Sequence, residues 1–306
     1  MSLKQKLKQI LPAPFKEMLL KKIQQVCMFS VNRALKEKRM DGIYKKLEEI
    51  VPDLTHQYST FTINDNYLIK KVRALHAFQV SMVREALSTI CQDNNGSEEL
   101  TVVDIGDSAG THIQYIKDFF PEYKLRCLSV NMDPQAVVRI KGKNLEAVCA
   151  RAEEIKNLSI DADLFLSFEM LEHLMNPSEF LYRLSKKTNC KIFVVTVPYL
   201  AKSRVGLRHI RRKENKDVFS ENTHLFELSP ADWKLLFQHS GWRIINEDIY
   251  YQYPRKSLLT PFLRRLWREW DYEGFYGAIL IKDNTWSKLY KSWEPEGKTE
   301  NSYCAT

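Results

Sequence analysis

The stretch ELTVVDIGDSAGTHIQYI, residues 99–116, decides the fold that we predict for the whole chain. Thr101 to Ile105 is a β-branched apolar run interrupted only by Asp104, a composition typical of a strand buried on both faces in a parallel sheet. Gly106 and Gly110 follow, where glycine allows positive φ, and a helix begins near Ala109 with free N–H groups. The stretch predicts a strand, a glycine turn and a helix, either as a plain structural turn or as the start of a ligand site.

Length, cysteine content and charge set the bounds for the rest of the chain. The 306 residues, 44% of them hydrophobic, suffice for one large α/β domain with an appendage. Six scattered cysteines without a C-x-x-C spacing predict neither a disulfide framework nor a zinc ribbon, and they fit a reducing compartment such as the cytoplasm. We expect no signal peptide and no membrane span, because no apolar run reaches roughly 18 residues. The net charge of +8 favours anionic partners such as nucleic acid, lipid headgroups or a phosphorylated substrate.

Residues 1–95 are predicted to form an N-terminal helical cap. Two basic amphipathic segments, separated by Pro12 and Pro14, open the chain, and a longer helix is expected over 64–90. The basic segments suit peripheral contact with an anionic membrane, and they equally suit helices packed on the domain with a solvated lysine face. The turn-rich sequence CQDNNGSEE, residues 91–99, predicts the domain boundary.

From residue 100 onward, strand-like runs alternate with helix-like stretches, which is the pattern of a doubly wound sheet. Asp133-Pro134 and Ser229-Pro230 have the composition of helix starts, with a capping side chain followed by proline. We assign 96–285 to one domain and 286–306 to a polar C-terminal tail. The predicted strands are 101–105, 125–130, 146–150, 163–168, 191–197, 242–251 and 275–282.

Three ordered segments resemble class I S-adenosylmethionine-dependent methyltransferases of the small-molecule O-methyltransferase type. VVDIGDSAG (102–110) is similar to their first motif, usually D-x-G-x-G-x-G, and FLSFEMLEHLMNPSEFLYRL (165–184) to their strand-four segment and the helix after it. HLFELSPADWKLLFQHSGWRI (224–244) resembles the helix before their last two strands. The resemblance covers about residues 99–283 and implies an α/β fold with a seven-stranded, mostly parallel sheet whose last strand is antiparallel. It also implies S-adenosylmethionine as cofactor, lying across the carboxyl ends of the strands.

Carried over by position, the resemblance assigns cofactor contacts to the glycine turn and to the neighbouring strand ends. Asp104 would accept a hydrogen bond from the cofactor ammonium, and Ser108 replaces the usual middle glycine. Asn131 replaces an acidic residue that takes both ribose hydroxyls, and Arg151 stands where an acid often contacts adenine. The implied cofactor residues are Asp104, Gly106, Asp107, Ser108, Gly110, Asn131, Met132, Ala152 and Phe168.

Glu169, Glu172, His173 and His224 are the candidate metal ligands. The first three have helical spacing, which predicts that they project from one face at the carboxyl edge of the sheet, and His224 arrives from a later loop. Two carboxylates and two imidazoles suit Mg²⁺, Mn²⁺ or Zn²⁺, which would lower the pKa of a substrate hydroxyl. The E-x-x-E-H…H pattern resembles ubiquinone-biosynthesis O-methyltransferases and small-RNA 3′-terminal 2′-O-methyltransferases. Two alternatives stay open: a metal-free catalytic pair with His173 as general base beside Glu172, and a purely structural role.

Three functions are compatible with the residues. We expect an S-adenosylmethionine-dependent O-methyltransferase (EC 2.1.1.-) that acts on a small-molecule, glycan or lipid-linked hydroxyl, with or without the assistance of a divalent metal. An RNA 2′-O-methyltransferase is the second, although the sequence has no recognisable RNA-binding module. The third is a non-catalytic binding protein with a degenerate site, suggested by Asn131 and Arg151. The basic insertion SRVGLRHIRRKENK, residues 203–216, either grips a phosphate or is a solvated loop.

Overall fold

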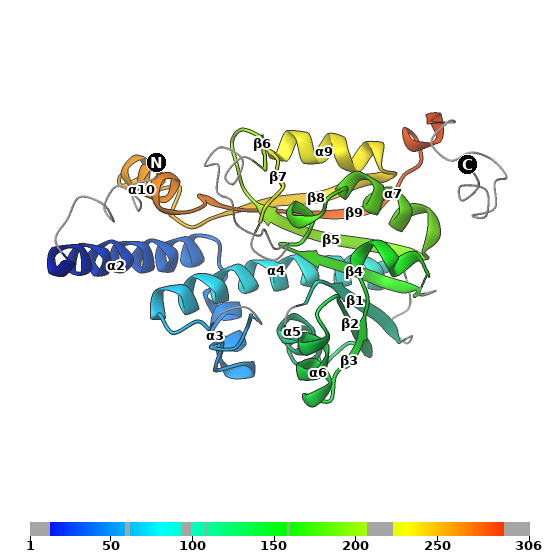
Figure 1. Ribbon diagram of the computed structural model, residues 1–306, viewed down its shortest axis with the longest axis horizontal. Coiled ribbons are helices and arrows are strands. Elements are labelled where there is room, and N and C mark those ends of the chain that lie inside the picture. The colour runs from blue at the N-terminus through cyan, green and yellow to red at the C-terminus, as the bar shows by residue number, and fades with distance from the viewer. Residues whose placement is uncertain are drawn as a thin grey trace, which may run out of the picture.

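A seven-stranded sheet with the order β3-β2-β1-β4-β5-β9-β8 organises the protein (Figure 1). The computed structural model describes residues 13–58, 62–93, 99–107, 109–157, 160–206 and 223–290. Strand β9 is antiparallel to both of its neighbours, whereas the pairs from β3 to β5 are parallel. The predicted doubly wound, mostly parallel sheet is therefore confirmed. The strands are β1 Leu100–Ile105, β2 Leu125–Asn131, β3 Glu146–Cys149, β4 Ala162–Phe168, β5 Cys190–Pro198, β8 Trp242–Tyr251 and β9 Gly274–Lys282.

Helices cover both faces of this sheet, and two short strands form a separate ribbon. The helices are α2 Ala13–Glu37, α3 Asp41–Ile50, α4 Asn66–Asp93, α5 Thr111–Phe119, α6 Pro134–Gly142, α7 Pro177–Lys187, α9 Pro230–His239 and α10 Thr260–Trp270. Short 3-10 segments are η1 Ala152–Asn157, η2 Leu171–His173 and η4 Ser287–Leu289. The ribbon pairs β6 Arg204–Val205 with β7 Phe226–Glu227. Among the described helices, none combines the length and the apolar composition that crossing a bilayer requires.

Alternate side chains of the central strands pack into two different hydrophobic cores, one on each face of the sheet. Leu164 and Leu166 of β4 join a cluster with α2, α3, α4 and α5, whereas Phe165 joins a cluster with α7 and α9. This alternation follows from the period of two in a strand, and it is why β4 is apolar at every one of these positions. In Figure 1, α4 and α5 lie on one side of the sheet and α7 and α9 on the other. The sheet is thus buried on both faces, as the sequence of β1 predicted.

The predicted helix starts are confirmed. The Asp133 side chain accepts a hydrogen bond from the Gln135 backbone N–H (2.9 Å), and the Ser229 hydroxyl accepts one from the Asp232 N–H (3.3 Å). Each capping side chain satisfies a donor that the first helical turn leaves unpaired, and the following proline has no such donor to lose. These caps fix where α6 and α9 begin. The loop just before α6 contains Met132, which lines the cavity described below.

The N-terminal helices pack on the sheet through α4. Arg73 of α4 is buried and donates to the carbonyls of Leu47, Val51 and Pro52, which caps the carboxyl end of α3. Gln79, further along α4, donates to the Thr196 hydroxyl of β5 (3.0 Å). The helix predicted over 64–90 is therefore confirmed as α4, and it lines one side of the site. The expected boundary near residue 95 falls within 94–98, outside the described ranges, and stays a prediction.

Candidate functional site

A cavity of about 450 Å³ opens at the carboxyl ends of β1, β2 and β4. Its floor includes Gly106, Asn131 and Phe168 from the strand ends, and α4 supplies a wall through Leu75, His76 and other residues. Parallel strands that end side by side leave such a crevice where their connections diverge to opposite faces of the sheet. Further lining residues are Tyr58, Lys71, Val72, Met132, Arg151, Ala152, Glu169, Glu172, His173, His224, Tyr272 and Phe275.

The turn after β1 needs glycine at both predicted positions. Gly106 has φ of 100° and Gly110 has φ of 72°, a region that side chains disfavour. A Cβ on Gly106 would also lie 3.0 Å from Cγ of Met170, so this glycine brings the cavity floor close to the next loop. Gly110 is the residue before α5, whose first N–H groups point back toward the turn. Ser108 lies outside the described residues, so its predicted role stays a prediction.

His112, rather than Asp104, lines the cavity beside this turn. The His112 Nδ1 lies 3.2 Å from Oδ2 of Asp104 and 3.6 Å from Oδ1 of Asp107, and both carboxylates are buried. Burial raises the pKa of Asp104 to about 6, against the opposing effect of His112. Burial alone would lower the pKa of His112, but its contact with Asp104 raises that pKa above the ordinary value. The predicted ammonium acceptor is thus covered by an imidazole that stands at the cavity wall.

Asn131 and Asp107 connect the loops that follow β2 and β1. The Asn131 amide donates to the Asp107 carbonyl (2.9 Å), and its Oδ1 accepts from the Asp133 N–H (2.8 Å). The Asp107 carboxylate accepts from the Ser129 hydroxyl (3.1 Å), away from the cavity. An amide has two N–H donors and two oxygen lone pairs, so Asn131 retains one of each for a ligand. Arg151 lines the rim and pairs with Glu153 at 3.5 Å.

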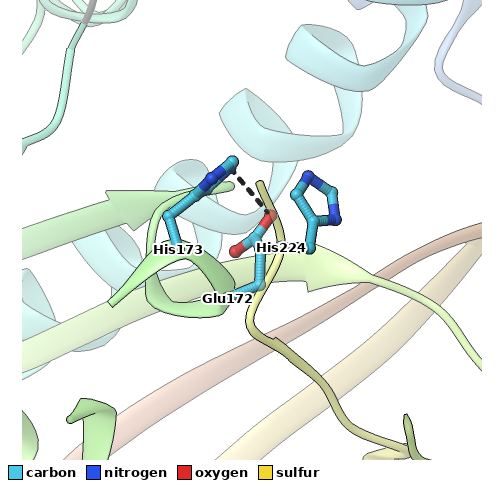
Figure 2. Close-up of side chains that lie close together, drawn as sticks. All are labelled: Glu172, His173 and His224. Carbon is cyan, nitrogen blue, oxygen red and sulfur yellow. Dashed lines mark ion pairs between the residues drawn. The ribbon is translucent and has the colours of Figure 1, made fainter. Parts of the chain in front are cut away.

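Glu172, His173 and His224 meet at one side of the cavity (Figure 2). One ligand atom from each lies within 4.8 Å of the others, and the two imidazole rings are 4.5 Å apart. The loop that carries His224 is fastened there because the Leu225 N–H donates to the Glu172 carbonyl (2.7 Å). Three of the four predicted ligands, from segments about fifty residues apart in the chain, therefore form one cluster.

Glu169 does not share a helical turn with the other two residues of its motif, so that prediction is wrong. It has φ of 53° and precedes η2, which begins only at Leu171. The left-handed residue reverses the chain and breaks the spacing that a continuous helix would give. Glu169 lines the cavity, but it is not a member of the three-residue cluster.

Each histidine of the cluster is oriented through its Nδ1. His173 Nδ1 lies 3.1 Å from the Thr223 carbonyl, which leaves Nε2 turned toward Glu172 at 4.0 Å. His224 Nδ1 lies 2.9 Å from the Tyr272 hydroxyl and 3.3 Å from Oε1 of Glu227. Metal-binding histidines are commonly held in this way, because a partner on one ring nitrogen fixes the tautomer and presents the other nitrogen to the metal.

Glu172 is a buried carboxylate whose oxygens have no hydrogen-bond partner among the described residues. Burial, with the charge of Glu169, raises the pKa of Glu172 well above its ordinary value. Burial likewise raises the pKa of Glu169 to about 8. Buried carboxylates without partners are costly, and a divalent cation between Glu172 and the two imidazoles would supply the missing charge. The donor set of one carboxylate and two imidazoles fits such an ion.

The comparison with protein families decides the identity of the chain. The methyltransferase-domain family matches residues 69–247, more than half of the chain, from α4 through most of β8. The chain belongs to the methyltransferase-domain family. No curated protein gives a significant match to this methyltransferase.

One solved structure, matched at a TM-score of 0.50, has the fold of this protein, and two further structures are matched below that score. A putative sarcosine dimethylglycine methyltransferase from Galdieria sulphuraria is 11% identical, with 72% of this chain and 88% of that chain covered at a TM-score of 0.50. A structure of the Haloferax volcanii Trm112 methyltransferase activator in complex with a putative methyltransferase gives a match of 14% identity. It covers 68% of this chain and 97% of that chain at a TM-score of 0.45. Magnesium protoporphyrin IX methyltransferase from Synechocystis PCC 6803, with bound S-adenosylhomocysteine, is 11% identical. The match covers 83% of this chain and 99% of that chain at a TM-score of 0.47. At 11% identity the Galdieria sulphuraria match shows the fold of this methyltransferase and not its substrate.

Sequence reasoning missed several residues of the methyltransferase site. Glu227 follows His224 by three residues, a spacing that could have been found. Tyr272 follows the end of α10, so its place in the site could not be predicted from sequence spacing. His112 follows the glycine turn by two residues and faces the cavity because α5 starts there. Residues 207–216 of the basic insertion lie outside the described residues, as do 217–222, 1–12 and 291–306.

Proposed function

We propose that this protein is an S-adenosylmethionine-dependent O-methyltransferase that acts on a small-molecule, glycan or lipid-linked hydroxyl with the help of a divalent cation. The Glu172, His173 and His224 cluster on the cavity wall carries the proposal, because an oxygen acceptor needs its proton removed and this cluster offers the groups to do so. Membership of the methyltransferase-domain family supports the reaction class.

The cofactor would occupy the part of the cavity between Gly106 and the η1 turn. Gly106 offers backbone that a ligand can approach closely, Asn131 retains hydrogen-bonding capacity toward a ribose, and Ala152 leaves room at the rim. The methyl group leaves as its bond to the sulfonium breaks and a bond to the acceptor oxygen forms. Since the sulfonium is already activated, the chain contributes alignment of the two reactants and removal of the acceptor proton.

The same cluster offers two ways to remove the acceptor proton. A divalent cation bound by Glu172, His173 and His224 would act as a Lewis acid that lowers the pKa of the acceptor hydroxyl, so that its proton leaves to solvent. Without a bound cation, His173 Nε2 can take the proton as general base beside the Glu172 carboxylate. Glu227 and Tyr272 hold His224 in position and do not themselves contact the acceptor in this scheme.

Two titrations test the proposal separately. Calorimetry with S-adenosylhomocysteine should show micromolar binding that Gly106→Arg abolishes, because the long side chain would fill the turn. Titration of metal-free protein with Mn²⁺ or Zn²⁺ should show one site, lost in Glu172→Gln and His224→Ala and kept in Glu153→Gln, a carboxylate on the same cavity outside the cluster. No cofactor binding under any condition would favour a non-catalytic binding protein.

An RNA 2′-O-methyltransferase is the second candidate, favoured by the E-x-x-E-H…H pattern and by the net charge of +8. Filter binding of a short RNA at two salt concentrations distinguishes the two candidates. Each phosphate contact adds to the salt dependence, so an RNA enzyme should lose affinity by orders of magnitude as salt rises. Binding that is absent at low salt would exclude this candidate.

A further inference from the structure

The first half of α2 presents apolar side chains to solvent. Among the described side chains from Pro14 to Val26 none is buried, and the first buried one is Cys27. Phe15 is 55% exposed and Met18 is 45% exposed. In Figure 1 the dark blue end of α2 extends away from the sheet. Exposed aromatic and sulfur-containing side chains on a projecting helix indicate a surface that contacts something apolar.

Helix α10 lies beside α2 and has the same character. Its Trp267 indole donates to the Ser30 hydroxyl of α2 (3.1 Å), and both residues are buried. On the outside, at the start of α10, Leu258 is fully exposed and Phe262 is 61% exposed. Since α2 and α10 pack against each other, their exposed side chains belong to one end of the molecule. We call this end, residues 13–37 and 254–270, the α2/α10 surface.

The α2/α10 surface is also strongly basic. Among its described side chains it exposes nine Lys and Arg and three Glu, and two of the nine, Arg264 and Arg268, pair with the buried Glu273 just after α10. Of the three Glu, Glu17 pairs with Lys21 at 2.9 Å, and Glu37 accepts hydrogen bonds from the Arg255 and Lys256 backbone. The exposed basic residues are Lys21, Lys22, Arg33, Lys36, Arg255, Lys256, Arg264, Arg265 and Arg268.

We propose that the α2/α10 surface docks on a membrane that contains anionic lipids. Apolar side chains interspersed with Lys and Arg are the combination that inserts between headgroups while pairing with their phosphates. Met18, Leu258 and Leu259 are exposed beside Phe15 and Phe262. Such a mixture of aliphatic and aromatic side chains suits insertion between lipid chains, whereas only the two phenyl rings could stack on bases.

Docking in this way would place the cavity near the lipid. Helix α10 leads directly to Asp271, which pairs with Lys71 at the cavity, and to Tyr272, which lines it. An acceptor held in the membrane would thus be delivered to the side of the cavity that α4 forms. The docking itself is independent of the proposed reaction, and it can be measured without any turnover.

Vesicle flotation with the full chain tests the docking. Wild-type protein should float with vesicles of phosphatidylcholine and phosphatidylglycerol, stay behind with phosphatidylcholine alone, and dissociate as salt rises. Lys22→Glu with Arg265→Glu should weaken binding at least about tenfold, since each basic residue near an anionic surface adds substantially to the affinity. The matched control is Lys117→Glu with Lys141→Glu, two exposed lysines on α5 and α6, and it should bind like wild type.

The apolar contribution needs its own variants. Phe15→Ser with Phe262→Ser should also weaken binding about tenfold, because buried apolar area is lost from the interface. Leu258→Ser alone removes a fully exposed side chain, so it tests the same point without risk to folding. No flotation with anionic vesicles, or equal flotation with neutral ones, would overturn the proposal. The proposal would also be overturned if the protein bound a short RNA but no vesicles, and if the apolar variants still bound that RNA. Thermal unfolding and binding of S-adenosylhomocysteine show whether each variant keeps its fold and its cofactor site.

Discussion

At the scale of single residues, the orientation of His224 decides whether the cluster can hold a metal. The Tyr272 hydroxyl contacts both His224 Nδ1 and Glu227, so it fixes the orientation of the ring. We expect Tyr272→Phe to weaken divalent metal binding by about tenfold or more, as is typical when an outer partner of a metal-binding histidine is lost. Calorimetric titration of the metal-free protein measures this. Tyr276→Phe is the matched control, since its hydroxyl donates to Glu247 on the surface (2.7 Å). Equal affinity of both variants would show that Tyr272 does not orient His224.

Glu227 gives the same region a dependence on pH. Burial would raise its pKa, but hydrogen bonds with His224, Arg204 and Tyr272 lower the pKa of Glu227 to about 2. A carboxylate with a depressed pKa stabilises the fold fully above its unfolded value of 4.5, and that stabilisation is lost as the pH falls toward 2. After allowance for solvent screening it is on the order of 2 kcal/mol.

Glu227→Gln should therefore lower the free energy of unfolding at pH 7 by about 2 kcal/mol and flatten its decline below pH 4.5. Urea unfolding across this range, with a chelator present, measures both effects. Glu122→Gln, on an exposed turn, should leave the curve unchanged. A Glu227→Gln curve parallel to that of wild type would contradict the assignment.

At the scale of elements, the turn between β1 and α5 depends on one glycine. Gly106 has positive φ, and a Cβ there would press against Met170 at 3.0 Å, so Gly106→Ala should cost about 1–3 kcal/mol of stability. It should also weaken binding of S-adenosylhomocysteine, since the turn forms the cavity floor. Gly142→Ala is the control: nothing lies within 4 Å of its added Cβ, and α6 should gain a few tenths of a kcal/mol from the better helix former. Chemical denaturation and calorimetry compare the two variants, and equal effects would refute the strain argument.

The seven strands of the main sheet were predictable from the sequence to within a residue because buried parallel strands are nearly continuous apolar runs. β4 and β5 show this, and Ser229 shows how a cap marks a helix start. The short helix α3 was missed although Ile43, Leu47 and Ile50 have helical spacing. The site was only partly predictable: the cluster of Glu172 with His224 followed from the resemblance, whereas Tyr272 is brought to His224 by tertiary packing across 48 residues.

At the scale of the whole molecule, α4 joins the N-terminal helices to the sheet. Phe78 of α4 is fully buried, its ring lies 5.9 Å from that of Tyr250 on β8, and it fills the space left by Gly277 on β9. One apolar cluster therefore runs from Cys27 of α2 to Val194 of β5. Contacts of this kind couple the two regions, so they should not unfold independently.

We accordingly expect a single unfolding transition, with near-ultraviolet circular dichroism and hydrogen exchange of α2–α4 reporting the same midpoint. Phe78→Ala should lower the free energy of unfolding by about 3–5 kcal/mol, because it opens a cavity between helix and sheet. Phe262→Ala, at a side chain 61% exposed, should cost less than about 1 kcal/mol. If Phe78→Ala instead unfolded the helices while the sheet kept its midpoint, residues 1–95 would be a separate unit that closes the cavity without sharing its stability. A single shared midpoint means that the wall formed by α4 is as stable as the strands, so the cavity keeps its shape before any ligand arrives.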